Sequence, residues 1–509
     1  MMDPLIRSIK QSDVPKSLTP YTEAVSIFLP TEAHRRDDTR AGDDNAIGLL
    51  VSMVLTGSCR HGNKALAVTA ISRNSFSLVM NLYTHWQSIA DRFSKDQALL
   101  DWKSGRSWTF GELQGELDCR ESAQPGAILF PNGREVELIF ETLRAWRDGV
   151  ILCPVEAATP DMARFAGIAD NIVHVKMTSG STAEPKLILF EASQLAADAE
   201  NIVVTMGLKS EWPNLGVISM AHSYGFSNLV TPLLLHGVPL VWVGDPLPAM
   251  MSTILEQEGR VYTLPAVPAM WRAWLEAGVI NSDAVKLGIS AGAPLSLELE
   301  DRLYEEAGLK VHNFYGSSEC GGIAYDRNEE PRTDASCVGT ALTNVGLEVR
   351  DSEGCLQVKS AAVGAGYWPA SENESALGGG EFTTSDLAEI DVADGQVLLR
   401  ARSGETINVA GRKVAPGKIE EAILRADSRI NNCVVFGVPS EDPERVEDIV
   451  VCLSSNDDEW DEVEMKIKVQ QHLASYEMPR HWWFCQDLKP NARGKISRRE
   501  WKEKFLLLN

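Results

Sequence analysis

A short segment rich in small residues and hydroxyl groups carries the clearest chemical pattern in the sequence. It reads TSGSTAEPK, ends at Lys186, and follows an apolar stretch at residues 172–175. Small residues let the backbone approach an anion closely, and hydroxyl groups can donate hydrogen bonds to phosphate oxygens. The alternative interpretation of such a segment, taken alone, is a polar turn on the protein surface. We predict a phosphate-binding loop, and its expected contacts are Thr178, Ser179, Gly180, Ser181, Thr182 and Lys186.

Four further segments follow this loop along the chain. They are residues 290–294 (SAGAP), 313–319 (NFYGSSE), 382–386 (FTTSD) and 491–498 (NARGKISR). Together and in this order, the five segments resemble the signature motifs of the adenylate-forming superfamily. This superfamily includes acyl-CoA synthetases, aryl-acid ligases, luciferases and the adenylation domains of peptide synthetases. The resemblance covers roughly residues 77–505.

Three of the segments depart from the usual motifs of that superfamily by one residue each. Ala183 stands where TSG[ST]TGxPK has a glycine, Ser318 replaces threonine in YGxTE, and Ser385 replaces glycine in [YF]xTGD. Alanine is tolerated where the backbone φ is negative, so we expect a stiffer phosphate loop rather than an inactive one. Ser318 keeps a hydroxyl for the α-phosphate.

The resemblance implies a role in binding ATP and Mg²⁺ for each matching residue. Tyr315 would present an aromatic face to adenine, and Asn313 an amide to the edge of the base. The carboxylate of Asp386 can accept hydrogen bonds from both ribose hydroxyls. Glu319 offers the hard oxygen ligand that Mg²⁺ prefers. The other nucleotide contacts that the resemblance implies are Gly292, Ala293, Pro294, Gly316, Ser318 and Arg402.

The resemblance assigns part of the reaction to the C-terminal part of the sequence. Lys495 would bridge the substrate carboxylate and the α-phosphate, and would stabilise negative charge as pyrophosphate leaves. Asn408 and Gly411 lie in a segment that would face the active site during thiol attack, where Gly411 leaves room for a pantetheine arm. Gly404 stands at the usual hinge position, and glycine suits a large change in φ and ψ.

His222 lies in the segment AHSYGF, which is similar to the HxxG of superfamily members that take simple acids. A lone histidine after an apolar strand is usually structural. The resemblance instead places His222 beside the acyl pocket. Relatives that activate amino acids use an aspartate in this segment, and its absence disfavours an amino-acid substrate. Gly321 and Gly322, after Glu319, suggest an open acyl pocket.

The elements that position these residues follow an alternating pattern from Leu82 onward. An apolar strand at residues 127–130, a helical pattern around 135–146 and a strand at 150–152 form one such unit. This alternation predicts parallel sheets with helices on both faces. Between Pro154 and Met177 the sequence is shorter than is usual for the superfamily, as though one strand–helix pair were missing.

The expected domain organisation follows from the motifs and from a turn-prone stretch near residue 403. Residues 1–76 show no readable functional pattern, residues 77–402 form the AMP-binding adenylation domain, and residues 403–509 form a mobile C-terminal domain. The fold class implied is α/β. Its large N-terminal domain would contain two wound α/β subdomains and a small β-barrel, and its small C-terminal domain would also be α/β.

The bulk composition limits the classes of partner. The chain has 509 residues, 44% of them hydrophobic, and a formal net charge of −23. Nucleic-acid binders need a basic surface, so this charge argues against such a partner. The nine cysteines form no CxxC pair, which favours a reducing, cytoplasmic location over a disulfide framework. The apolar stretch at residues 46–55 is too short to span a bilayer.

The resemblance implies a reaction in two steps. A carboxylate attacks the α-phosphate of MgATP to give acyl-AMP and pyrophosphate, and a thiol, most often that of coenzyme A, then releases AMP. The implied partners are a small carboxylic acid and coenzyme A. Three alternatives stay open: a separate acyl carrier protein with phosphopantetheine as acceptor, an amine as acceptor, and a degenerate, non-catalytic nucleotide-binding homologue. The sequence does not distinguish a fatty, aryl or other acid.

Overall fold

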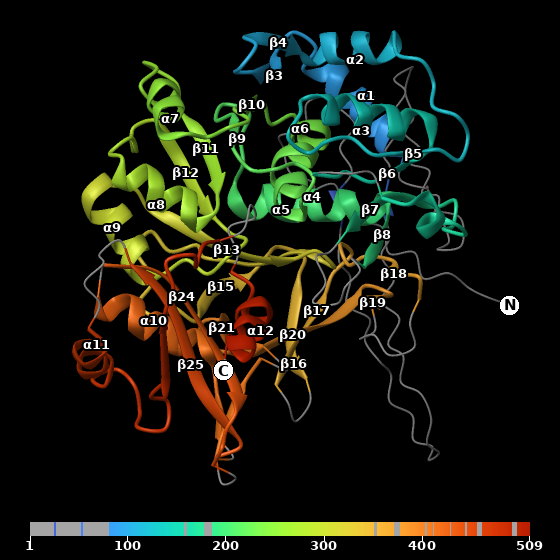
Figure 1. Ribbon diagram of the computed structural model, residues 1–509. Helices are drawn as coiled ribbons and strands as arrows, with labels where there is room; N and C mark the ends of the chain where they lie inside the picture. The colour runs from blue at the N-terminus through green and yellow to red at the C-terminus, as the bar shows by residue number, and fades with distance from the viewer. Residues whose placement is uncertain are drawn as a thin grey trace, which may run out of the picture. The chain divides into compact units, whose positions relative to one another are not determined.

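The computed structural model describes most of the chain beyond residue 80. The described ranges are 81–156, 160–177, 186–350, 354–370, 377–402, 405–410, 412–427, 429–442, 445–455, 461–490 and 496–508, with two short strands before them. The chain divides into two compact units, Met1–Val79 and Met80–Asn509. In the first unit, β1 (Val25–Ser26) and β2 (Ser52–Met53) pair antiparallel. All other described elements belong to the second unit (Figure 1).

The largest sheet joins a wound α/β section to an antiparallel section. Its order is β16-β17-β20-β21-β15-β14-β13-β12-β11-β9-β10-β3-β4, with β19 (Leu377–Gly378) paired to β20. The wound section pairs parallel from β3 to β13. Its strands are β3 (Gln97–Asp101), β9 (Asn214–Gly216), β10 (Leu240–Trp242), β11 (Tyr262–Ala266), β12 (Val285–Ser290) and β13 (Val311–Ser317), and β4 (Arg106–Thr109) closes the edge.

Some helices of this part begin or end at capping residues that the sequence supplies. Thr109 and Glu112 form a capping box on α2, and Gly207 ends α4 in the left-handed conformation. The helices are α1 (Leu82–Arg92), α2 (Phe110–Asp118), α3 (Glu137–Asp148), α4 (Ala192–Met206), α5 (Ser223–Gly225), the π-helix η4 (Phe226–Val230), α6 (Thr231–His236), α7 (Pro248–Leu255), α8 (Pro268–Glu276) and α9 (Leu297–Ala307).

A second, five-stranded sheet has the order β18-β8-β7-β6-β5. Its parallel strands β5 and β6 flank α3, which confirms the strand–helix–strand unit predicted for residues 127–152. The strand β6 pairs directly with β7, and the described residues between them form one short 3-10 helix, η3 (Met162–Phe165). This short connection agrees with the shortened stretch noted in the sequence. The strands are β5 (Ile128–Leu129), β6 (Ile151–Leu152), β7 (Ile172–Met177), β8 (Leu187–Glu191) and β18 (Gly366–Trp368).

The antiparallel section of the large sheet corresponds to the small β-barrel predicted from the sequence. It contains β14 to β17 together with β20 and β21, and α4 packs on it through Ile202 and Met206. Buried apolar residues of β14, β17 and β20 complete this core. The strands are β14 (Gly321–Tyr325), β15 (Cys337–Ala341), β16 (Gly346–Arg350), β17 (Cys355–Lys359), β20 (Glu381–Ile390) and β21 (Gln396–Arg402).

The C-terminal part is a three-stranded sheet with helices on both faces. Alternate residues of a strand point to opposite faces. Val435 and its neighbours on one face therefore pack on α10 and α11, whereas Val434 and its neighbours pack on Trp501 of α12. The elements are β22 (Ile407–Val409), β23 (Arg412–Val414), α10 (Pro416–Ala426), β24 (Ile430–Pro439), β25 (Glu447–Ser455), α11 (Glu462–Val469), β26 (His481–Phe484) and α12 (Arg498–Leu508).

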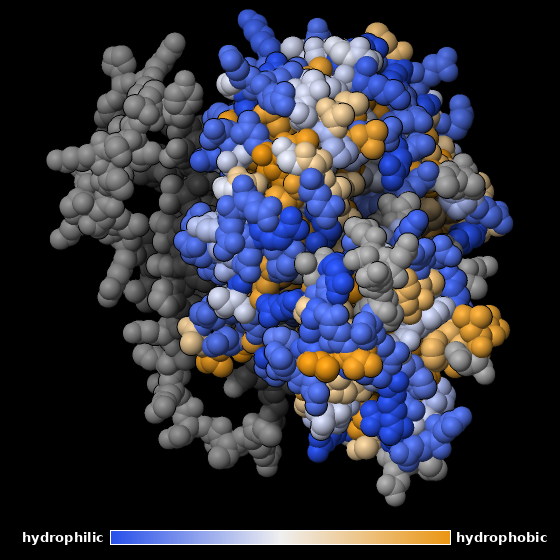
Figure 2. Space-filling view, turned by 60° about the vertical axis from the view of Figure 1, so that its left-hand side comes forward, coloured by the Kyte–Doolittle hydropathy of each residue, from blue (hydrophilic) through white to orange (hydrophobic). Residues whose placement is uncertain are grey.

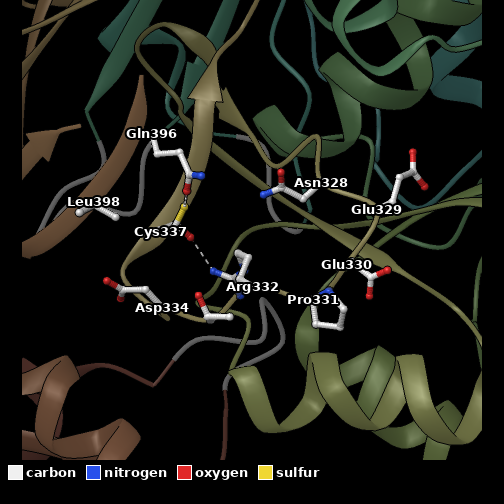
Figure 3. A pocket seen from close by; sticks show the side chains of 10 residues that line it. Asn328, Glu329, Glu330, Pro331, Arg332, Asp334, Cys337, Gln396 and Leu398 are labelled. Atoms are coloured by element: carbon white, nitrogen blue, oxygen red, sulfur yellow. Dashed lines mark hydrogen bonds between the residues drawn. The ribbon is translucent and has the colours of Figure 1, made fainter. Parts of the chain in front are cut away.

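A buried cluster of charges joins α9 to the open end of the hairpin β13–β14. Glu300 of α9 is fully buried, and its carboxylate lies 2.5 Å from Lys310 Nζ and 2.8 Å from Arg332 Nε. Lys310 Nζ also lies 2.7 Å from Asp326 Oδ2. Arg332 donates further hydrogen bonds, one of them to the carbonyl of Cys337 beside a small cavity (Figure 3). Each buried charge therefore has an oppositely charged partner.

The visible surface is mainly hydrophilic. Figure 2 shows blue side chains over most of the face, with separate orange patches between them. Among the described residues, no helix is both long enough and apolar enough to cross a membrane.

The charge cluster gives a direct test of what stabilises this part of the fold. We expect Glu300→Gln to lower the free energy of unfolding by about 3–5 kcal/mol, because it leaves two buried cations short of a partner. The matched control on the same helix is Glu306→Gln, which breaks a solvent-exposed pair with Arg302 and should cost far less, because exposed ion pairs contribute little to stability. Urea denaturation followed by tryptophan fluorescence measures both, and equal costs would contradict the assignment.

Candidate nucleotide-binding site

The strands β12 and β13 bring the two predicted adenine-side segments together. These strands are parallel neighbours, and Ser290 at the end of β12 pairs with Asn313. The turn of Gly292, Ala293 and Pro294 follows β12 at the same edge of the sheet. Gly292 has a φ of +86°, a left-handed conformation that favours glycine. The backbone thus places this turn beside the segment that contains Asn313.

Tyr315 and Asp386 meet although 71 residues separate them in the chain. The phenol hydroxyl of Tyr315, on β13, donates a hydrogen bond to Asp386 Oδ2 at 2.5 Å. Asp386 lies on β20, and its backbone pairs with that of Arg402 on β21. The proposed adenine residue and the two proposed ribose residues are therefore neighbours. The side chain of Arg402 is outside the described part of the structure.

Glu319 is held by a tyrosine that sequence reasoning did not assign to the site. Tyr367 Oη donates to Glu319 Oε1 at 3.0 Å. Lys186 Nζ lies 5.2 Å from the centre of the Tyr367 ring, within reach of a cation–π interaction. Tyr367 reaches Lys186 because β18 pairs antiparallel with β8, with Tyr367 opposite Ile188. In the sequence, Tyr367 lies in the segment GYW at residues 366–368, which resembles a segment common in acyl-CoA synthetases.

The described residues suit Mg²⁺ bound together with a nucleotide rather than a metal held by protein alone. No group of three or more His, Cys, Asp or Glu side chains in the described ranges is arranged to hold a metal. Mg²⁺ at nucleotide sites is usually held by one or two carboxylates together with phosphate oxygens and water. Glu319, a hard oxygen donor placed beside Tyr367 and the lysine of the phosphate segment, fits that mode of binding.

His222 lies beside Glu156, a second residue that the sequence did not reveal. His222 Nε2 lies 3.1 Å from Glu156 Oε1. The contact with His222, helped by Ser219 and Arg134, outweighs the effect of burial and lowers the pKa of Glu156 to about 2. Glu156 is therefore ionised over the whole range in which the enzyme would work, and it fixes a negative charge beside the imidazole.

Gly225, the glycine of the HxxG segment, lies where there is no room for a side chain. A Cβ on Gly225 would lie 2.0 Å from the carbonyl oxygen of Ser219, closer than any side chain allows. Beside it, Tyr224 donates to the carbonyls of Ala266 and Ile289 at 3.3 and 3.2 Å. Burial raises the pKa of Tyr224 well above its usual value, so the phenol stays neutral and its hydroxyl remains a donor.

The expectation that Gly321 and Gly322 open an acyl pocket is wrong. A Cβ on Gly321 would lie 2.0 Å from Asp198 Oδ1, and one on Gly322 would lie 2.4 Å from Leu342 Cδ2. The space beside both glycines is filled by other side chains. Gly316 is similar, since its Cβ would approach the carbonyl oxygen of Gly321 to 2.7 Å. These glycines permit close packing of the hairpin.

The structure describes some of the remaining predicted residues, and the others lie outside its described ranges. Ser318 lies in the turn before Glu319. Asn408 lies on β22, and its backbone N–H donates to Glu447 Oε2 at 2.7 Å. The predicted residues outside the described ranges are Thr178, Ser179, Gly180, Ser181, Thr182, the hinge residue Gly404, Gly411 and Lys495.

Two family models match this chain. One, described as AMP-binding enzyme, matches residues 146–368, and one described as AMP-binding enzyme C-terminal domain matches residues 418–495. Together they match more than half of the chain.

Named relatives agree with the family models. A 4-coumarate–CoA ligase-like protein of Oryza sativa subsp. japonica is 26% identical over 385 residues, 71% of this chain and 67% of that protein. A 2-succinylbenzoate–CoA ligase of Enterococcus faecalis is 26% identical over 358 residues, 66% of this chain and 71% of that protein. ATP-bound MatB from Rhodopseudomonas palustris has the same fold, with a TM-score of 0.71, 20% identity, and 84% of this chain and 99% of that chain covered.

The predicted fold class and the prediction of an AMP-forming ligase are confirmed. The order of the motifs, the strands that carry them and the two matching family models all lead to one conclusion. This chain belongs to the AMP-binding enzyme family of the adenylate-forming superfamily.

Proposed function

We propose that this protein couples ATP to a small carboxylic acid, forms acyl-AMP and pyrophosphate, and passes the acyl group to the thiol of coenzyme A. The observation that carries the proposal is a pair of hydrogen bonds at one hairpin: Tyr315 donates to Asp386, and Glu319 at the turn of that hairpin accepts from Tyr367. Relatives named as CoA ligases support the choice of acceptor. A carrier-protein thiol and an amine are the other acceptors to test.

The mechanism assigns each side chain a task in binding or in charge stabilisation. Tyr315 and Asn313 hold the base, and Asp386 accepts from the ribose hydroxyls. The phosphate loop, with Lys186, holds the phosphates. Lys495 bridges the acid carboxylate and the α-phosphate, and it stabilises the negative charge that develops as the P–O bond to pyrophosphate breaks. Mg²⁺, held by Glu319 and phosphate oxygens, would neutralise charge on the triphosphate.

The hydrogen bond between Tyr315 and Asp386 prepares the site before ATP binds. It fixes the ring of Tyr315 and one carboxylate oxygen of Asp386, so less side-chain entropy is lost when the nucleoside arrives. His222 and Glu156 are proposed to act at the acyl end, where ionised Glu156 orients the imidazole. For the second step, we propose that the part from residue 403 onward rotates about Gly404, withdraws Lys495 and brings Asn408 and Gly411 to the thiol.

The compartment is proposed from cysteine chemistry. The eight described cysteines are all free thiols, as expected for a protein of the reducing cytoplasm.

The proposal is tested by pyrophosphate exchange with a panel of fatty, aryl and short-chain acids. Exchange that depends on one class of acid supports adenylation, and a second assay with coenzyme A, a phosphopantetheinylated carrier protein or amines then identifies the acceptor. ATP binding without exchange, for every acid, would instead support the non-catalytic alternative.

Lys495 should be needed in one half-reaction only. We expect Lys495→Ala to lower the rate of acyl-AMP formation by about 100-fold or more, because a preorganised charge at the α-phosphate is lost. Thioester formation from supplied acyl-AMP should stay within about twofold, since the lysine is withdrawn in that step. Single-turnover assays of the two half-reactions measure both. Equal loss in both would contradict the assignment.

Tyr367 should act through its hydroxyl on Glu319. We expect Tyr367→Phe, which keeps the ring beside Lys186, to raise the Mg²⁺ concentration needed for half-maximal adenylation by about tenfold, because a hydrogen bond to a carboxylate is lost. Glu319→Gln should change the same quantity in the same direction by more, because it removes the charged ligand itself. If the double variant Tyr367→Phe/Glu319→Gln needs no more Mg²⁺ than Glu319→Gln alone, Tyr367 acts through Glu319. If the two increases in the Mg²⁺ requirement add, the two residues act independently.

A further inference from the structure

Asp198 is a buried carboxylate that the mechanism above does not use. It lies in the middle of α4 and is 4% exposed. Aspartate is a poor helix former, and burying a carboxylate is costly unless it is paired and hydrogen-bonded. Both carboxylate oxygens of Asp198 have donors: Ser227 Oγ donates to Oδ2 at 2.5 Å, and the backbone N–H of Gly322 donates to Oδ1 at 3.0 Å. Its partners therefore lie in the tertiary fold, and one belongs to the hairpin that carries Glu319.

The backbone after Glu319 is shaped around this carboxylate. Gly321 has a φ of +70°, and a Cβ there would lie 2.0 Å from Asp198 Oδ1 and 2.3 Å from its Cγ. Neither the conformation nor the space admits a side chain. The other end of the turn is tied by Ser317, whose Oγ accepts from the backbone N–H of Glu319 at 3.2 Å. Asp198 thus occupies the position against which residues 319–322 are packed.

Lys176 supplies the opposite charge from the neighbouring sheet. It lies on β7, is 4% exposed, and its ammonium lies 4.3 Å from the centre of the Phe190 ring. Burial lowers the pKa of Lys176, and Asp198 is the largest influence that opposes this, followed by Cys320 and Glu319. Lys176 and Asp198 are therefore two buried, opposite charges that influence each other. A positive charge there offsets part of the cost of burying the carboxylate.

We propose that Asp198 is a positioning residue that holds the turn after Glu319 and so fixes Glu319 for the metal bound with ATP. The proposal rests on the proposed function, because it concerns the metal that accompanies ATP. Side chains that support a ligating carboxylate typically change metal affinity by about 10- to 100-fold when they are lost. A role confined to stability would change the thermal midpoint and leave metal affinity unaltered.

Two double variants distinguish the effect of the turn's position on metal affinity from the effect of the buried charges. Lys176→Met/Asp198→Asn and Lys176→Met/Asp198→Leu both remove the buried positive charge and the buried negative charge together. Asparagine still accepts from the Gly322 N–H, whereas leucine does not. The probe is Mn²⁺ with α,β-methylene-ATP, since Mn²⁺ takes the same oxygen ligands as Mg²⁺ and the analogue cannot release pyrophosphate. Electron paramagnetic resonance then measures metal affinity without turnover.

We expect the asparagine double variant to bind Mn²⁺ within about twofold of the wild type and the leucine double variant to bind about tenfold more weakly. Glu319→Gln gives the reference for complete loss of the ligand. Asp198→Glu is a second, independent variant that keeps the charge and the acceptor. Its additional methylene has no room beside Gly321, so it should displace the turn and also weaken Mn²⁺ binding by about tenfold.

Each outcome decides for or against the positioning role. Wild-type affinity in both the leucine double variant and Asp198→Glu overturns it, and equal weakening in the two double variants would mean that charge, rather than the hydrogen bond to Gly322, is what matters. If the leucine variant fails to fold, Asp198→Glu carries the test. A wild-type protein that binds no Mn²⁺ with the ATP analogue would refute the proposed function itself, which is a different result from unchanged affinity in the variants.

Discussion

The hairpin β13–β14 is anchored at both ends by buried carboxylates, and the site depends on this constraint. At the open end, Lys310 before β13 and Asp326 after β14 are joined by an ion pair of 2.7 Å, with Glu300 of α9 on the other side of the lysine. At the turn, Asp198 of α4 accepts from the backbone of Gly322. Between these ends, β13 pairs with β12 and β14 pairs with β15 in the large sheet. Fixed at both ends, the hairpin holds Tyr315 and Glu319 in a defined orientation.

The anchored hairpin makes contact with two other parts of the fold through phenol hydroxyls. Tyr315 of the hairpin donates a hydrogen bond to Asp386 of β20, and Glu319 of the hairpin accepts a hydrogen bond from Tyr367 of β18. The first contact joins the wound section of the large sheet to its antiparallel section. The second joins the large sheet to the five-stranded sheet that leads to the phosphate segment. These two hydrogen bonds thus link strands that carry the base, ribose and phosphate ends of the predicted nucleotide site.

The sequence predicted those parts of the site that depend on local backbone and motif order. Parallel strands ending at one edge explain why the turn at Gly292 and the segment at Asn313 could be placed together. Tyr367, Glu156 and Asp198 could not be assigned in the same way, because their partners lie far away in the chain and a side-chain contact leaves no periodic signal. The same limit explains the error at Gly321, where a glycine that suggested empty space is instead filled by Asp198.

One departure from the usual motifs, at Ser385, now has a physical interpretation that bears on catalysis. Ser385 lies on β20 and is exposed, and it is absent from the described residues with positive φ, so this backbone does not need the usual glycine. Thr384 Oγ1 accepts from the backbone N–H of Asp386 at 3.1 Å and keeps the end of the motif in place. Glycine-to-serine exchange therefore costs little at this position, whereas the carboxylates of Asp386 and Glu319 each have a dedicated phenol donor. Donors of this kind are maintained at the cost of side-chain entropy, which argues for a working nucleotide site rather than a degenerate one.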